Sequence, residues 1–316
     1  MTSPSAVPDV RESCLRVAGR ASHVRIDGAA LSSLAGELAA GRPVIPAWEE
    51  DHAGSGDAEE GAGWTLVLSA LNFCFWEDEP RWRVEGADGY MALAAAMRRA
   101  VRDGVPVHRA DHVAAWSVAE LAEVLRGDPG GPAGPPLLAE RHEVTVELAR
   151  WLVREHGGSA LSPLAAASSA AGFAVELASR LRGFRDVAVH RGEPVAFLKR
   201  AQIAAYDCAT ALGDEAPAGL RDRGGLTAFA DYKVPQVLRA CGVLEYSPSL
   251  ADTVDARVEL AAGSEAEVEI RATAVVAVDR LAALSGIEAC AVDTLLWWRG
   301  QGLREPPYHR TRTIWY

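Results

Sequence analysis

Four short segments of this 316-residue chain carry more aromatic, amide and ionisable residues than core packing requires. They are residues 71–76 (LNFCFW), 199–202 (KRAQ), 229–236 (FADYKVPQ) and 309–316 (HRTRTIWY). Aromatic rings stack on flat heterocycles, amides hydrogen-bond to heterocycle edges, and carboxylates and cations stabilise charge during a reaction. The four segments therefore indicate a ligand site with ionisable groups in it.

In this combination and order, the segments resemble the queuosine salvage protein family. The resemblance extends from about residue 24 to residue 316, nearly the whole chain. The family consists of N-glycosidases that release the 7-deazaguanine base queuine from queuosine 5′-monophosphate. It therefore implies a hydrolase that takes a small nucleotide and needs no cofactor or metal. Residues 49–63 are acidic and glycine-rich, where family members usually carry a more aromatic segment, which leaves a substrate contact from this segment open.

Cleavage of an N-glycosidic bond builds positive oxocarbenium character on the ribose. Such a site needs a carboxylate near the anomeric carbon, either as a nucleophile or to stabilise the charge and orient water. It must also help the base to leave. A 7-deazapurine lacks N7, the usual protonation site of a purine, so hydrogen bonds to its other edge and stacking on its face carry more of this task.

Asp231 is the strongest candidate for the catalytic carboxylate. It stands between Phe229 and Tyr232 and precedes Pro235, which suits the first turn of a helix that ends near Gly242. From spacing alone, Asp231 could equally cap that helix. The family resemblance favours the catalytic role.

Lys199 is the second candidate catalytic residue. Two cations, Lys199 and Arg200, follow an apolar stretch, a pattern that also suits a pair of surface side chains with buried stems. In the role that the resemblance implies, Lys199 lies in the pocket beside Asp231 or the phosphate and holds the aspartate ionised. We expect charge pairing and not Schiff-base chemistry, because a simple hydrolysis needs no covalent amine.

The aromatic and amide residues are expected to surround the base. Asn72 is assigned to the base edge and Phe73 or Trp76 to its face, although at least one of the aromatics in residues 73–76 must pack as plain core. The acidic run of residues 77–79 would complement the cationic secondary amine of queuine, or form a solvated loop. Phe229 and Tyr232 complete the predicted surroundings of the base.

The 5′-phosphate requires cations or hydrogen-bond donors. The candidates are Lys199, Lys233, Arg271, His309 and Arg310. Arg271 also has Glu267 four residues before it, the spacing of an ordinary pair within a helix. The C-terminal segment, residues 309–316, could instead dock the last helix.

Composition narrows the class of ligand and the compartment. The formal net charge is −11, which argues against a protein that grips nucleic acid by its phosphates and favours one phosphorylated nucleotide. Five widely spaced cysteines without a C-x-x-C pair indicate reduced thiols, no zinc site and a cytoplasmic location. No apolar run spans a bilayer, and residues 1–10 lack the pattern of a secretory signal. The oligomeric state cannot be read from the sequence.

Helix signals dominate the chain, so we predict a mainly α fold with at most a short β-hairpin. Caps are expected at Asp27, Ser117 and Ser264, a helix stop at Gly300, and a hairpin around residues 191–193. Serine and proline at 162–163 predict the start of one long alanine-rich helix. The family resemblance implies a DNA-glycosylase-like architecture.

The domain prediction has three parts. Residues 1–126 form an N-terminal helical part with the base-binding segment, residues 127–136 a Gly/Pro linker or loop, and residues 137–316 a helical part with the catalytic segments. Residues 49–63 are expected to form a second loop. Two other functions stay open: a glycosidase acting on another modified nucleotide or on DNA, and a binding protein that holds the modified base without cleaving anything.

Overall fold

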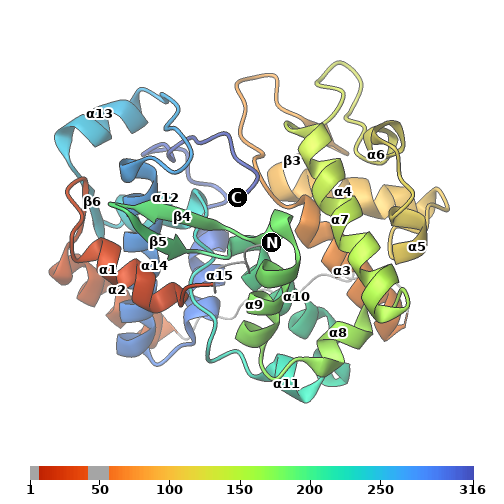
Figure 1. Ribbon diagram of the computed structural model, residues 1–316. Coiled ribbons are helices and arrows are strands. Elements are labelled where there is room, and N and C mark those ends of the chain that lie inside the picture. The colour runs from red at the N-terminus through yellow and green to blue at the C-terminus, as the bar shows by residue number, and fades with distance from the viewer. Residues whose placement is uncertain (1–6, 42–56) are drawn as a thin grey trace.

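Helices make up most of residues 7–41 and 57–316, the part of the chain that the computed structural model describes (Figure 1). The mainly α prediction is confirmed. In chain order the helices are α1 (Val10–Ala18), α2 (Gly28–Gly41), α3 (Ala58–Leu71), α4 (Gly89–Arg102), α5 (Ala110–Val113), α6 (Val118–Val124), α7 (Leu138–His156), α8 (Leu161–Ala166), α9 (Ala170–Arg180), α10 (Lys199–Leu212), α11 (Ala218–Arg221), α12 (Lys233–Ala240), α13 (Pro248–Asp255), α14 (Glu265–Ser285) and α15 (Ala289–Arg299), with short 3-10 turns η1 (Arg182–Phe184) and η2 (Gly213–Glu215).

The predicted helix caps are present. The Asp27 carboxylate accepts a hydrogen bond from Ala30 N, and Ser117 and Glu120 form a complete capping box at α6. Ser264 caps α14, but the Glu267 carboxylate turns to other partners and does not close a box. Gly300 ends α15 as expected.

Strands occur only as short antiparallel pairs in the described residues. The predicted hairpin is confirmed as β4 (Val187–His190) and β5 (Glu193–Ala196), joined through Arg191 and Gly192 at positive φ. Two further pairs accompany it: β2 (Arg83–Val84) with β3 (Ala87–Asp88), and β1 (Val24–Ile26) with β6 (Leu244–Tyr246).

Two local predictions were wrong. The expected loop over residues 49–63 lies partly outside the described residues, but Ala58 to Gly63 begin helix α3, because the Asp57 side chain caps it at Glu60 N. Gly63 permits a close approach, since a Cβ there would lie 2.2 Å from His108 O. The expected long helix after residue 162 is instead two helices, α8 and α9, because Ser169 caps a new start at Gly172 N.

The two ends of the described chain pack together. Figure 1 shows α1 and α2 beside α14 in one half of the molecule, while α4 to α7 occupy the other half. One apolar cluster joins Cys14 and Leu34 to Val275, and another joins Trp64 and Leu93 to Trp116. Residues 127–136 contain no helix or strand. The three-part domain division and the DNA-glycosylase-like architecture stay predictions.

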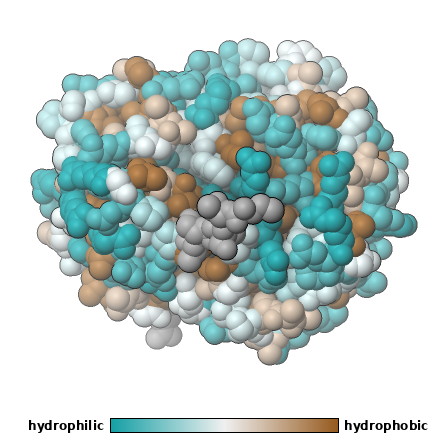
Figure 2. Space-filling model, viewed as in Figure 1, coloured by the Kyte–Doolittle hydropathy of each residue, from teal (hydrophilic) through white to brown (hydrophobic). Residues whose placement is uncertain are grey.

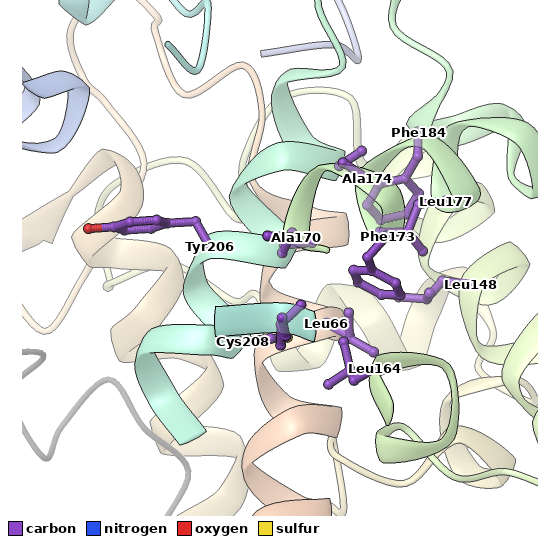
Figure 3. Close-up of a cluster of buried hydrophobic side chains, with 14 of the residues drawn as sticks. Leu66, Leu148, Leu164, Ala170, Phe173, Ala174, Leu177, Phe184, Tyr206 and Cys208 are labelled. Carbon is purple, nitrogen blue, oxygen red and sulfur yellow. The ribbon is translucent and has the colours of Figure 1, made fainter. Parts of the chain in front are cut away.

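Helix α10 lies between the halves and has two different faces. Figure 3 shows Cys208 near Leu66 and Leu164, while the Tyr206 ring extends from the other side of the helix. The first face packs into the core, and the second carries side chains that line a cavity. The helix period therefore separates a structural face from a functional one.

The surface shows mixed polarity. On the face drawn in Figure 2, hydrophilic side chains are interspersed with small apolar patches. In the part of the chain that the structure describes, no helix is both long enough and apolar enough to cross a membrane.

Candidate active site

A cavity of about 660 Å³ lies between α4, α10, the start of α12, α15 and the segment that follows α15. It has the size of a small-molecule site. Eight of the residues that the sequence predicted for catalysis, base binding or phosphate binding line it: Asn72, Phe73, Lys199, Phe229, Asp231, Tyr232, Lys233 and Arg310. Trp76, Arg271 and His309, which were predicted as well, do not.

Asp231 both caps a helix and lines the cavity. Its Oδ1 accepts hydrogen bonds from Lys233 N at 2.8 Å and from Val234 N at 3.0 Å, at the start of α12. The cap weighed from the sequence is therefore present, and the catalytic role stays a prediction. Since both hydrogen bonds go to Oδ1, the other carboxylate oxygen, Oδ2, is available to a ligand in the cavity. Burial raises the pKa of Asp231, while Lys199 and the two N–H groups lower it.

Lys199 opens α10 and is 4% exposed. Its Nζ donates a hydrogen bond to Asn72 O at 3.1 Å, and its backbone N–H donates to Asp186. Among the described residues no carboxylate lies within 4.0 Å of Nζ. Lys199 therefore acts on Asp231 by electrostatic attraction over a longer distance and not by a contact ion pair. Burial lowers the pKa of Lys199 to about 8, and Asp231 opposes this shift.

Two more buried carboxylates line the cavity in addition to Asp231. Asp207 lies two turns after Lys199 on α10, and Asp293 lies in the first turns of α15, where it accepts a hydrogen bond from Phe229 N at 2.9 Å. Burial raises the pKa of Asp207 to about 8. Burial, together with the neighbouring Asp231, raises the pKa of Asp293 well above its ordinary value.

The three carboxylates share one buried ammonium group, Lys199. Like charges in one site cannot all ionise, so their pKa values separate according to surroundings. Asp231 has two N–H donors and the strongest coupling to Lys199, so it retains negative charge most readily. Burial and the charge of Asp231 both favour the protonated form of Asp293.

Aromatic rings form the cavity walls. The rings of Tyr206 and Phe229 lie 5.5 Å apart, and those of Tyr232 and Tyr308 lie 4.7 Å apart. Tyr90 meets Trp297 edge to face at 5.7 Å. These rings come from α4, α10, α15 and the loops beside α12 and after α15, and they suit a flat heterocycle.

Phe73 and Trp76 are less suited to stacking than the sequence suggested. The Phe73 ring is fully buried, and the guanidinium groups of Arg141 and Arg200 lie over it at 4.3 Å and 4.8 Å. Arg141 also donates hydrogen bonds to the carbonyls of Leu71, Phe73 and Cys74. Residues 71–74 are thereby held so that Asn72 reaches the cavity. Trp76 donates its indole N–H to Thr311 O and ties the C-terminal segment down.

Arg271 and His309 belong to a buried ion-pair cluster, which we define as Asp186, Glu267, Arg271, His309 and Tyr316. Of these five residues only Tyr316 lines the cavity. Arg271 binds Asp186 through two nitrogens, at 2.5 and 3.1 Å, and Glu267 at 3.4 Å. The Tyr316 hydroxyl donates to Glu267 and bonds to His309 Nε2. Burial lowers the pKa of His309 to about 3, so this ring is neutral and a poor phosphate ligand.

This cluster connects the backbones that carry both predicted catalytic residues. Arg271 Nε donates to Ala230 O, one residue before Asp231. Asp186, which Arg271 clamps, accepts hydrogen bonds from the backbone N–H groups of Phe197, Leu198 and Lys199. Arg271 therefore positions Asp231 and Lys199 relative to one another.

The mouth of the cavity is rich in cations. Lys233 and Arg310 were predicted for phosphate binding, and the structure adds Arg81, Arg83, Arg257 and Arg304 to the lining. Of the acidic run 77–79, only Glu79 lines the cavity, where it is exposed and lies near Arg81, while Asp78 pairs with Arg310.

Sequence reasoning missed Asp207, Asp293, Tyr206 and Trp297. A signal existed for two of them. Asp207 shares the helix face of Lys199, Ile203 and Tyr206, and Asp293 is a lone acid in the apolar run of α15. An acidic residue on an otherwise apolar helix face indicates a buried functional group.

One other group of side chains in the described residues has potential metal ligands close together. His190, Glu265 and Glu269 have ligand atoms within 4.8 Å of one another, outside the cavity. Arg191 pairs with Glu265, and Glu269 accepts hydrogen bonds from Ser22 N and His23 N. These partners already satisfy both carboxylates.

Comparisons with known proteins agree with the geometry. Residues 52–316 match the model of a family described as queuosine salvage protein. A protein of Sphaerobacter thermophilus is 41% identical over 328 residues, covering 100% of both chains. Proteins of Mus musculus and Dictyostelium discoideum are 32% and 31% identical, each over 97% of this chain and 98% of its relative. All three relatives are named queuosine 5′-phosphate N-glycosylase/hydrolase.

Proposed function

This chain belongs to the queuosine salvage protein family, and from that premise we propose that it is an N-glycosidase that hydrolyses queuosine 5′-monophosphate to queuine and ribose 5-phosphate. The observation that carries the proposal is the placement of Asp231. One of its oxygens is anchored by two backbone N–H groups, and the side chain lines a cavity that also holds Lys199 and aromatic walls. A cytoplasmic location and action without a cofactor belong to the same proposal.

In this proposal Asp231 stabilises the oxocarbenium-like ribose or attacks its anomeric carbon. Lys199 keeps Asp231 ionised from a distance, since its pKa of about 8 leaves it cationic at neutral pH. Asp293, held protonated by burial, donates a hydrogen bond to the leaving base and replaces the missing assistance at N7.

The remaining cavity residues bind the two ends of the substrate. The base lies between Phe229, Tyr206 and Trp297, with Asn72 at its edge. The 5′-phosphate lies at the mouth, where Lys233 follows Asp231 by two residues and Arg81 and Arg310 are near. We leave Arg271 and His309 out of the phosphate site because the ion-pair cluster holds them.

The proposal is tested by incubating the protein with queuosine 5′-monophosphate, queuosine and guanosine 5′-monophosphate, with Asp231→Asn as the inactive control. We expect queuine from the first substrate above all. Release of queuine from queuosine at the same rate would show that the 5′-phosphate is not recognised. Binding without any release would make the protein a carrier, and cleavage of guanosine 5′-monophosphate would assign it another nucleotide.

Borohydride treatment during turnover tests the role of Lys199. We expect no adduct, because the Lys199 ammonium acts through its charge. A trapped ribosyl adduct on this residue would show covalent amine catalysis instead.

A further inference from the structure

Asp207 is a buried carboxylate without a partner. Its side chain lines the cavity from α10 and is 8% exposed. No hydrogen bond and no ion pair reaches it from the residues that the structure describes. Asp231 and Asp293, by contrast, each accept backbone N–H groups. Asp207 therefore makes no contact that would give it a role in stabilising the fold.

An unpaired carboxylate in such a place costs folding free energy. Its usual compensation is a cation or several donors, and burial without them raises the pKa of Asp207 to about 8. Lys199 does not supply the contact, because its Nζ bonds to Asn72 O and its Cα lies roughly 12 Å away along α10. At the mouth, Arg81 pairs with Glu79, Arg310 with Asp78 and Arg257 with Glu305, and Lys233 donates a hydrogen bond to Gly300 O. The missing partner must therefore be sought in the ligand.

The surroundings favour a cation over a neutral donor. Asp207 has neither a cation nor a hydrogen-bond donor in contact with it, so an amine placed against it would lower its pKa and pair with the ionised carboxylate. Tyr206 precedes Asp207, and the charge of Asp207 also acts on Tyr90, whose ring contacts Trp297. Aromatic faces near an anionic group attract cations further.

We propose that Asp207 binds the cationic secondary amine on the side chain of queuine, and that it thereby selects bases that carry this amine. The inference rests on the proposed function for the identity of the base. It transfers the expected amine contact from the exposed run 77–79 to the interior of the cavity. Glu79 remains available to the solvent and to Arg81.

The test compares binding of four bases to the full chain. Queuine and 7-aminomethyl-7-deazaguanine carry the amine, whereas 7-cyano-7-deazaguanine and 7-deazaguanine do not. We expect Asp207→Asn to weaken the first two by about 10- to 100-fold, the effect of a lost charge-assisted hydrogen bond. The two neutral bases should change by less than about twofold.

Glu79→Gln is the matched control, because Glu79 also lines the cavity but is exposed and paired. It should leave all four affinities nearly unchanged. A loss confined to Glu79→Gln would place the amine at the mouth and overturn the proposal. An equal loss for all four bases in Asp207→Asn would show that Asp207 binds the shared guanine-like edge, and no loss would also refute the idea.

The wild-type hydrolysis assay separates this inference from the proposed function. An amine-selective effect of Asp207→Asn in a protein without hydrolysis would support the binding inference and refute the enzyme. Hydrolysis of queuosine 5′-monophosphate with no amine selectivity would do the reverse. Thermal unfolding of Asp207→Asn confirms that the variant is folded.

Discussion

The inner cavity and the ion-pair cluster beside it are both buried and both contain charged groups, but the charges are paired in the cluster and unpaired in the inner cavity. In the cluster, Arg271 contacts Asp186 and Glu267, and Glu267 accepts a hydrogen bond from Tyr316. In the cavity, Asp207, Asp231 and Asp293 share Lys199, and none of these three forms a contact ion pair with a described residue.

The difference indicates that the cluster holds residues in place, whereas the unpaired groups of the cavity are available to a ligand. Paired charges with satisfied hydrogen bonds define one arrangement of the chain, and breaking them leaves an uncompensated buried charge. Unpaired charges cost folding free energy in the free protein and are useful only when a ligand or a transition state supplies the partner. Residues of the cavity and of the cluster should therefore respond oppositely to substitution.

Asp231→Asn is expected to have the largest effect on activity. The asparagine Oδ1 can still accept from Lys233 N and Val234 N, so the start of α12 is preserved. We expect kcat/KM for queuosine 5′-monophosphate to fall by about 10³-fold or more, as for a lost charge-stabilising group. The melting temperature should be equal or higher, because a buried charge is removed. Activity near that of the wild type would end the catalytic assignment.

Arg271→Met should have the largest effect on stability. It leaves Asp186 and Glu267 buried without their cation, which costs about 3–5 kcal/mol of unfolding free energy. Denaturant unfolding measures the loss. The control is Arg299→Met, which removes an exposed pair with Glu37 and should cost at most about 1 kcal/mol. Equal losses for the two variants would show that the cluster stabilises the fold no more than an exposed ion pair does.

Asp207 should make the ligand-free protein less stable as the pH rises. Its pKa is about 8 when folded and about 3.9 when unfolded, so between these values only the folded state binds the proton. Stability should decrease across this window, by on the order of a few kcal/mol in total, and level off above pH 8. Asp207→Asn should lose this component when unfolding is measured at several pH values. An unchanged pH slope in the variant would show that Asp207 titrates normally.

Trp76→Phe should have the smallest effect. It removes the hydrogen bond to Thr311 O and keeps the aromatic bulk, at a cost of about 1 kcal/mol of stability. Because Trp76 does not line the cavity, KM should stay unchanged. A raised KM at unchanged stability would indicate that Trp76 contacts the base, as the sequence analysis expected.

Local signals in the sequence predicted several caps and the hairpin, whereas the caps at Asp57 and Ser169 were missed. The caps at Asp27, Ser117 and Ser264 depend on neighbours within three residues, and each is present. The hairpin depends on two residues, Arg191 and Gly192, that accept positive φ. Such features need no knowledge of the rest of the chain.

The division of charges between cavity and cluster could not be predicted in the same way. Arg271 contacts Asp186, which is 85 residues away in the sequence, and that contact places it in the ion-pair cluster and outside the cavity lining. Asp207 and Cys208 are adjacent, but one lines the cavity and the other packs in the core. Periodicity shows which residues share a helix face. It does not show whether that face packs against other side chains or lines a cavity.

The pairing of β1 with β6 has a consequence for synthesis of the chain. Val24 pairs with Tyr246, and α1 and α2 pack on α14, so these N-terminal elements meet their partners only after most of the chain exists. Contacts this distant in sequence slow folding, because a long loop must close first. During translation the apolar faces of α1 and α2 stay exposed to solvent until α14 has left the ribosome. The half of the molecule that holds Asp231 is thus completed last, together with the cluster that positions it.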